Sequence, residues 1–243
     1  MHELWITRLC NQVLAGPANA VLQMAGLHAE DPSKPWSNYM AMLLLVMGIF
    51  LILPFIVRRG LSVDAPGKIQ QIFEVIYSFL DEMAHEIIGH GHKKHVAFFA
   101  TLFLFILVSN LIGVVPSLES PTMFSPVPLG LAAFTFLYYN FFGFAEQGLV
   151  GYLKHFAGPI WWLAWFMFPL EIISHLVRPL SLTIRLFANM LAGEQVTLGF
   201  MALVPLVVPV AFMGLHVFVS FVQAFIFTVL AIVYVGSAVE HEH

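Results

Sequence analysis

The chain has 243 residues, of which 60% are hydrophobic and only 10% are charged, and its mean hydropathy is +0.88. A soluble domain is typically about half apolar and about a quarter charged, so this composition excludes an ordinary soluble protein and indicates a bilayer. The net charge of −4 and the lack of a long Lys/Arg run exclude nucleic acid as a partner. The single cysteine, Cys10, cannot form an internal disulfide.

The first 25 residues do not have the uninterrupted apolar core of a secretory signal, because Glu3, Arg8 and Pro17 fall within them. We therefore expect them to belong to the mature chain. A transmembrane helix needs about 20 mostly apolar residues. The sequence predicts a first such helix over 38–57 and a pair of them within 95–148, all in a single membrane domain, 1–243.

Between the first and second spans the pattern becomes amphipathic. Apolar residues recur at intervals of three and four from Ile69 to Met83, with acidic Glu74, Asp81 and Glu82 between them. This predicts an amphipathic helix within 64–92 on the cytoplasmic face. Because its polar side is acidic, packing on protein is as plausible as binding to lipid.

The last apolar tract, 156–239, is ambiguous from periodicity alone. It fits either four ordinary spans or two long, tilted helices, and its prolines mark possible kinks or breaks: Pro169, Pro179, Pro205 and Pro209. A break near 204–209 would leave a first segment of about 45 residues, or about 68 Å as a helix. Such a helix would have to cross the bilayer strongly tilted.

The distribution of Lys and Arg predicts the orientation of the chain. Six of the eight Lys and Arg residues after the first span lie in two segments: Arg58, Arg59, Lys68, Lys93 and Lys94 in the first, and Lys154 in the second. The loop 116–127 has none. Residues 58–95 and a turn at 149–155 are therefore expected in the cytoplasm, with the N-terminus and the 116–127 loop outside and the C-terminus cytoplasmic.

Charged residues inside the last tract are the most informative feature, because an ionised side chain at the bilayer centre costs about 2.5–3.5 kcal/mol on insertion scales. At 100° per residue, five polar residues fall within about 80° of one helix face: Glu171, His175, Arg178, Arg185 and Asn189. Glu194 falls about 140° from Glu171 and belongs to another face or path. A weaker stripe follows: His216, Ser220, Gln223, Phe227 and Tyr234. The alternative is a polar clamp that only joins helices.

Two strings in this tract carry a family resemblance. SLTIRLFANMLAGE, from Ser181 to Glu194, and QAFIFTVLAIVY, from Gln223 to Tyr234, resemble motifs of subunit a of F-type ATP synthases. PLEIISHLVRPLSL also fits, SNLIGVVP fits loosely, and together the resemblance covers about residues 159–238. It implies an all-α polytopic membrane protein whose last two helices form a long, tilted hairpin along a ring of c subunits.

The resemblance also implies roles for individual residues. Arg185 matches the family's essential arginine, Asn189 and Gln223 its polar neighbours, Glu194 and His216 the outer half-channel pair, and Glu171 the carboxylate near the cytoplasmic exit. Secondary candidates are His175, Arg178, Ser220, Glu146 and Glu119. Gly113 stands where some relatives carry an Asp thought to help proton entry. Either Glu119, Glu146 or ordered water takes that role, or no substitute is needed.

The expected function is that of a non-catalytic stator that passes protons to and from ring carboxylates through two offset half-channels. The implied partners are the c ring, subunit b, the F1 sector and lipid, in a bacterial inner membrane. Titratable Glu194 and His216 favour H⁺ over Na⁺. No GxxxxGK[ST] phosphate loop is present, so nucleotide chemistry belongs to other subunits. No cofactor or metal is expected.

Two other classes of function remain open. A cluster of four histidines, His85, His90, His92 and His95, would suit a membrane metalloenzyme. A solvated, interfacial turn is the favoured interpretation, because no second histidine cluster occurs in the later spans. A secondary transporter usually shows paired repeats and broken helices, and the sequence shows no such repeat.

Overall fold

The computed structural model describes residues 4–24, 34–62, 67–115, 118–157, 164–203 and 207–239, and the regular elements in these ranges are all helices. They are α1 (Trp5–Met24), α2 (Asn38–Arg59), α3 (Lys68–Ile88), α4 (Lys93–Ile112), the 3-10 turn η1 (Pro121–Met123), α5 (Pro126–Ala157), α6 (Ala164–Leu203) and α7 (Val207–Val239). Within these ranges, four segments are long and apolar enough to cross a membrane: Asn38–Arg58, Lys93–Ile112, Pro126–Gly148 and Val210–Val239. The all-α membrane class is confirmed.

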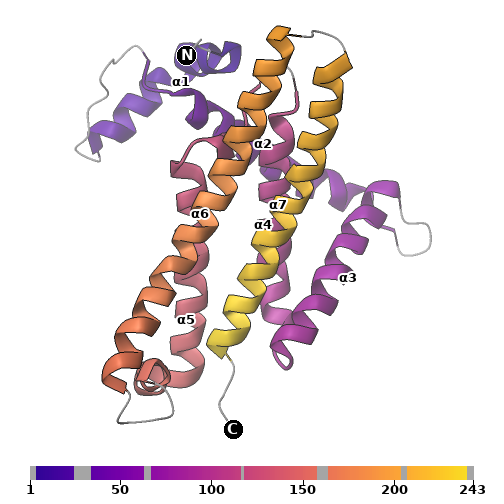
Figure 1. Cartoon of the computed structure of the whole chain (residues 1–243). Helices are drawn as coiled ribbons and strands as arrows, with labels where there is room; N and C mark the ends of the chain where they lie inside the picture. Colours follow the sequence, from indigo (N-terminus) through magenta and orange to yellow (C-terminus); the bar gives the residue numbers. More distant parts are fainter. Residues whose placement is uncertain are drawn as a thin grey trace.

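The last tract forms two long helices rather than four spans. α6 has 40 residues and α7 has 33, and the two run antiparallel, side by side (Figure 1). At 1.5 Å per residue they are about 60 and about 50 Å long, well beyond a hydrocarbon core of about 30 Å. They must therefore cross the bilayer tilted. Pro169 and Pro179 lie inside α6 without ending it, and residues 204–206 of the expected break lie outside the described ranges.

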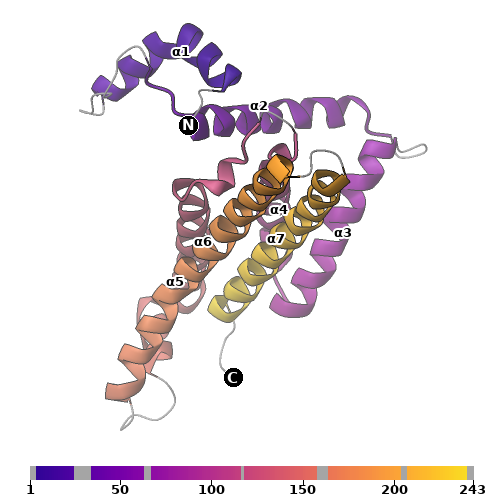
Figure 2. The same cartoon turned by 45° about the horizontal axis from the view of Figure 1, so that its top comes forward.

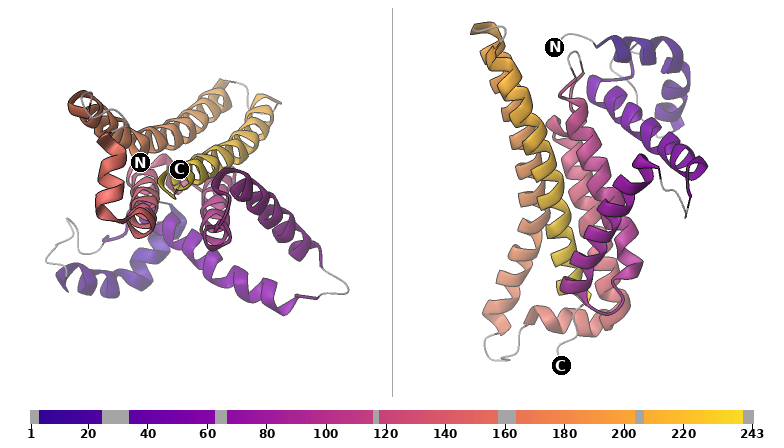
Figure 3. Two further views of the ribbon diagram at one scale, coloured as in Figure 1. Left: turned by 90° about the horizontal axis from the view of Figure 1, so that it is seen from below. Right: turned by 90° about the vertical axis from the view of Figure 1, so that its right-hand side faces the viewer.

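The core lies where α4, α5, α6 and α7 meet. Phe99 and Ile106 of α4 pack with Tyr139 of α5, Leu186 of α6 and Ile232 of α7, and each of these is at most 1% exposed. Between membrane helices such packing replaces the hydrophobic effect as the source of association. In the view at the right of Figure 3, α6 and α7 form one layer with α4 and α5 behind it. One face of the hairpin is therefore left open.

The amphipathic helix α3 packs on the protein core along one part of its length and is exposed along the other. Leu80 and Ala84 are buried against the α4–α7 core, whereas Ile69, Ile72 and Val75 are each more than half exposed. A Cβ at Gly236 of α7 would lie 3.1 Å from Cγ2 of Ile87, and so α3 and α7 meet closely at their ends. Packing on protein therefore accounts for the second half of α3 and leaves the first half for lipid or a partner.

Three features differ from the sequence prediction or extend it. The sequence did not predict α1. The Asn11 side chain joins α1 to the segment before α2, since it accepts a hydrogen bond of 3.0 Å from the N–H of Trp36 and donates one of 3.3 Å to the C=O of Trp36. α2 crosses the bundle at a steep angle (Figure 2). The turn expected at 149–155 is wrong: the chain bends at Gly148, where φ is 72° and ψ is 164°, and continues as helix to Ala157. Glycine has no Cβ and adopts this positive φ without strain.

Candidate functional site

The polar stripe of α6 does not face one environment. His175 is buried, Glu171 and Arg178 are half-buried, and Arg185 and Asn189 are exposed. The stripe is about 80° wide, and the boundary between the buried and the open face of α6 falls inside it. The helix therefore divides its polar residues between an internal cluster and an outward-facing pair.

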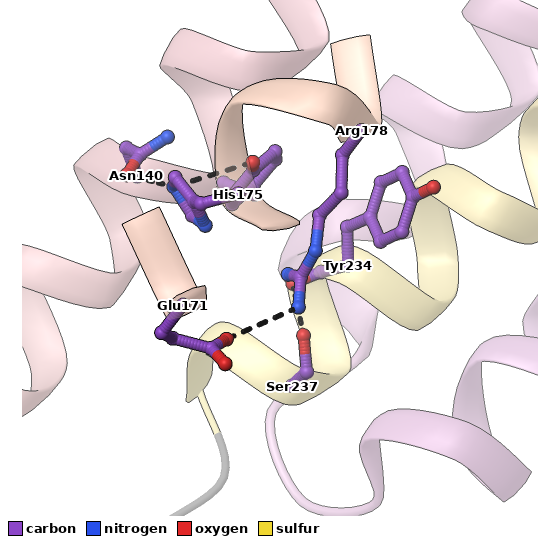
Figure 4. A network of polar contacts seen from close by, with 7 residues as sticks. Asn140, Glu171, His175, Arg178, Tyr234 and Ser237 are labelled. Atoms are coloured by element: carbon purple, nitrogen blue, oxygen red, sulfur yellow. Dashed lines mark hydrogen bonds and ion pairs between the residues drawn. The ribbon is translucent and has the colours of Figure 1, made fainter. Parts of the chain in front are cut away.

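The internal cluster joins α5, α6 and α7 at the end of the bundle where α7 finishes (Figure 4). Glu171 and Arg178 form an ion pair at 3.8 Å, and the Arg178 guanidinium lies over the Tyr234 ring, 5.2 Å from its centre. Nε2 of His175 is 3.0 Å from Oδ1 of Asn140 and 3.3 Å from the Tyr139 hydroxyl. The charge of Arg178 therefore has partners within the chain, as a polar clamp would.

Arg185 has a different setting. It is exposed, and the described part of the chain offers it no hydrogen bond or ion pair. Its neighbours Leu180 and Ile184 are 53% and 54% exposed on the same open side of the helix. A guanidinium stays charged in a protein, and a lone charge in the bilayer is costly. Within the described part of the chain, Arg185 therefore differs from Arg178, which has an ion-pair partner.

Beyond Arg185, a cavity of about 360 Å³ opens between α6 and α7. Its polar lining includes Asn189, His216 and Gln223. Within the described ranges, Nε2 of His216 and Oε2 of Glu194 are buried without a hydrogen-bond partner. A cavity of this size has room for water, and His216 lines it, whereas Glu194 lies next to Gly193 of its wall.

Gly193 lets His216 lie close to α6. A Cβ at position 193 would lie 3.2 Å from Nδ1 of His216, so the imidazole would have to shift by a few tenths of an ångström to admit it. The polar stripe on α7 faces inward, since His216, Ser220, Gln223 and Phe227 are buried and Tyr234 is half-buried.

A buried polar network that the sequence did not predict lies beside the cavity between α6 and α7. Thr122 donates a hydrogen bond of 2.6 Å to Oδ1 of Asn110, and Nδ2 of Asn110 donates one of 3.4 Å to the carbonyl of Ser220. The Ser120 hydroxyl donates to the carbonyl of Ser109 at 2.9 Å. The only signal in the sequence was a polar Ser-Asn pair inside the apolar span of α4. The network joins the 118–123 segment to α4 and α7.

The structure explains why position 113 is glycine. A Cβ there would lie 2.8 Å from Cβ of Ser120 and 3.1 Å from its backbone nitrogen, so no side chain fits. Of the candidate substitutes, Glu146 pairs with Lys94 at the start of α4. Gly113 follows the opposite end of that helix, so Glu146 is not placed to replace a side chain at 113. Glu119 lies on the segment that closes over Gly113.

We predict that Gly113→Ala destabilises the protein by about 1–3 kcal/mol, the usual cost of overpacking, because Ser120 and its backbone must move. Gly130→Ala is the matched control, since a Cβ at Gly130 meets nothing within 4 Å. Thermal unfolding of the two purified variants would check this. Equal stability of the two variants would contradict this prediction, because it would show that the 118–123 segment moves aside at little cost in free energy.

The histidine cluster lies at the turn between α3 and α4. His92 is 3.2 Å from Asp81, the rings of His85 and His92 are 4.7 Å apart, and Nδ1 of His95 is 2.8 Å from the hydroxyl of Tyr138. Across the ranges the structure describes, no three His, Cys, Asp or Glu side chains gather in a way that could hold a metal ion. These contacts tie α3, α4 and α5 together and give no support to a metalloenzyme.

Comparison with known proteins gives a consistent result. The family model described as ATP synthase A chain matches residues 40–236. ATP synthase subunit a of Solibacter usitatus (strain Ellin6076) is 54% identical over 233 residues, 96% of this chain and 99% of that one. The subunit a of Koribacter versatilis (strain Ellin345) is 49% identical over 243 residues, 100% and 99% of the two chains. That of Oleidesulfovibrio alaskensis is 42% identical over 198 residues, 82% and 84%. With an outward-facing arginine on a long membrane hairpin and near full-length relatives of this name, the chain belongs to the ATP synthase subunit a family.

Proposed function

We propose that this chain is the proton-conducting stator of an F-type ATP synthase and that Arg185 is the charge that separates its two half-channels. The observation that carries the proposal is the contrast between the two arginines of α6. Arg178 is paired internally with Glu171, whereas Arg185 is exposed and has no partner in the described part of the chain. An unpaired cation on an open membrane face suits a carboxylate that arrives on a moving neighbour.

The mechanism follows from the cost of charge in lipid. A ring carboxylate must be neutral while it faces the hydrocarbon. At the stator it releases its proton to one path and meets the Arg185 guanidinium as an anion. It must then accept a proton from the other path before it returns to lipid. A proton beside a fixed cation is disfavoured, so protons cannot pass Arg185 directly and must travel with the ring.

The two paths correspond to the polar groups on either side of Arg185 along the hairpin. The outer half-channel contains His216, Asn189 and Gln223, which line the cavity between α6 and α7, and Glu194, which follows Gly193 of the cavity wall. The inner one contains Glu171. Along α6, Glu171 lies about 21 Å from Arg185 and Glu194 about 14 Å on the other side, at 1.5 Å per residue. These distances leave Arg185 as the barrier between them.

The secondary candidates support these paths. On the inner side, Arg178 pairs with Glu171 and lies over Tyr234 of α7, and His175 bonds Asn140 of α5. Ser220 is buried on α7 near the outer path. Each proton that crosses 100 mV delivers about 2.3 kcal/mol, so several must pass for each ATP. The nucleotide sites belong to the F1 sector, which subunit b holds in place relative to this chain.

We further propose that the chain lies in a bacterial inner membrane with its N-terminus outside and its C-terminus cytoplasmic. Lys93 and Lys94 begin α4 at the end of the bundle where α7 finishes, and basic residues favour the cytoplasmic side. This orientation places Glu171 toward the cytoplasm and Glu194 toward the outside.

Disulfide cross-linking in the assembled complex tests the proposal. Ala188 is exposed on α6 three residues after Arg185. With Cys10 replaced by alanine, Ala188→Cys should cross-link rapidly to a cysteine placed beside the ring carboxylate. Leu137→Cys, 65% exposed on α5 behind the hairpin, is the control and should not. Equal cross-linking of both, or none at position 188, would contradict the proposal and favour a transporter that works without a ring.

A further inference from the structure

The outer end of the proposed proton path lacks an obvious first acceptor, since position 113 has no room for a side chain. The segment that fills this space, 118–123, carries Glu119. This carboxylate lies between the end of α4 and η1, outside the candidate membrane spans. It is half-buried rather than solvated.

Glu119 is held by the N-terminal part of the chain. Nδ2 of Asn38, the first residue of α2, donates a hydrogen bond of 3.4 Å to Oε2 of Glu119. Oδ1 of Asn38 accepts hydrogen bonds from the Thr7 hydroxyl at 2.9 Å and from the backbone N–H of Leu4 at 3.4 Å. The Asn38 amide nitrogen therefore orients the Glu119 carboxylate, and Thr7 of α1 and the preceding Leu4 hold the oxygen of the same amide. The matched family region begins only at residue 40, so this support lies outside it.

A second cavity adjoins this support. Its volume is about 360 Å³, and its polar lining includes Thr7, Asn11, Lys34 and Asn38. It is separate from the cavity between α6 and α7, with which it shares no lining residue. Water in it can reach the amide that holds Glu119.

On its other side Glu119 borders the outer half-channel. Glu119 and Glu194 are close enough to interact electrostatically. The next residue, Ser120, is 2.7 Å from Thr122, which is bonded to Asn110 and through it to α7. Glu119 therefore lies between a polar cavity at the α1–α2 end and the polar groups that approach Arg185.

We infer that Glu119, oriented by Asn38 and Thr7, is the outermost carboxylate of the proton path. It takes a proton from a hydronium ion in the N-terminal cavity, leaving water behind. It then gives that proton to water on the Glu194 side and becomes a carboxylate again. This inference rests on the proposed function and gives residues before position 40, where the family match begins, a part in the path.

The electrostatic surroundings suit this exchange. Burial raises the pKa of Glu119 above its usual value, and the hydrogen bond from Asn38 opposes that rise. The N-terminal amino group also lowers the pKa of Glu119, and Glu194 of α6 interacts with it electrostatically. A raised pKa brings a carboxyl group nearer to the pH of the outer water, where it can both accept and release a proton.

The test uses the whole ATP synthase reconstituted in vesicles, with proton flux measured as a function of pH on the outer side. Glu119→Gln keeps the shape but cannot carry a proton, so flux should fall about tenfold or more. Glu119→Asp should restore most of it. Glu82→Gln, an exposed carboxylate of α3, is the control and should match the wild type.

Asn38→Ala tests the positioning role separately. It removes a donor that stabilises the charged carboxylate, so the pKa of Glu119 should rise and the pH profile of flux should move to higher pH. Gln70→Ala removes an amide of the same kind, which bonds the backbone of Ser62 away from Glu119 and from the N-terminal cavity. It should leave the profile in place, which separates loss of the donor to Glu119 from loss of an amide contact elsewhere.

The outcomes separate this inference from the proposed function. Wild-type flux and pH profile in Glu119→Gln, together with slow flux in Glu194→Gln, would overturn the inference and leave the proposed function intact. Coupled synthesis that survives loss of Arg185 would overturn the proposed function itself. If Glu119→Gln does not assemble, the Asn38→Ala profile decides, and an unchanged profile there would also overturn the inference.

Discussion

Arg185→Ala is expected to abolish proton-coupled ATP synthesis, with a loss of at least about 100-fold. Two unit charges 4 Å apart attract by about 4 kcal/mol at an effective dielectric of 20, and about 4 kcal/mol is about a thousandfold in an equilibrium. Without the guanidinium, the ring carboxylate has no counter-ion at the stator and stays protonated. The ring can then turn past the stator without exchanging its proton. ATP synthesis driven by an imposed proton gradient in vesicles measures this.

Arg178→Ala is the matched control for Arg185, because it removes an arginine from the same helix and from the same polar stripe. Arg178 is already paired with Glu171 and packed on Tyr234. Its loss should slow synthesis without abolishing it. Arg185→Lys keeps a positive charge but replaces the fork of donors by a point charge that deprotonates more readily, so partial activity is expected. Equal losses at positions 178 and 185 would contradict the separate roles given to the two arginines.

Glu194→Gln is expected to slow proton uptake from the outer side by about 100-fold, the lower end of what a positioned proton-transfer group contributes. The amide fills the same volume but cannot bind and release a proton. The effect should appear in the rate of proton flux and not in assembly with the ring. His216→Gln should slow uptake as well, and the double variant should lose less than the product of the two effects, because groups in one path are coupled.

Gln195→Ala is the control for Glu194. Gln195 is the next residue on α6, is exposed, and does not line the cavity between α6 and α7. Its replacement should leave proton flux unchanged. If flux were normal in Glu194→Gln and in the double variant, water alone would carry protons through the outer half-channel.

The long hairpin illustrates what could be predicted from sequence. The charges of α6 recur at helical spacing, and the first resemblance string carries Arg185. Both patterns depend only on the order of residues close together in the chain, which a sequence shows directly. The division of the stripe could not be seen, because the spacing gives angles around α6 but not the edge of the neighbouring helix. The burial of His175 depends on where Tyr139 lies, and that of Arg178 on where Tyr234 lies.

Long-range contacts account for most of what the sequence did not predict. The bond from Asn110 to the Ser220 carbonyl joins residues 110 positions apart, and that from Asn38 to Glu119 joins residues 81 apart. No periodicity marks such pairs. The bend at Gly148 was missed for a local reason, since a glycine in sequence does not reveal whether its φ is positive.

The most direct test of the central claim is a structure of the assembled complex that shows what faces Arg185. We expect a ring carboxylate within about 4–6 Å of the guanidinium, the range in which an opposite charge stabilises an ionised acid. We also expect two separate water-filled paths that reach this carboxylate, one from Glu194 and one from Glu171. A guanidinium bound to a carboxylate of its own chain, or turned toward lipid with no rotor surface opposite, would contradict it.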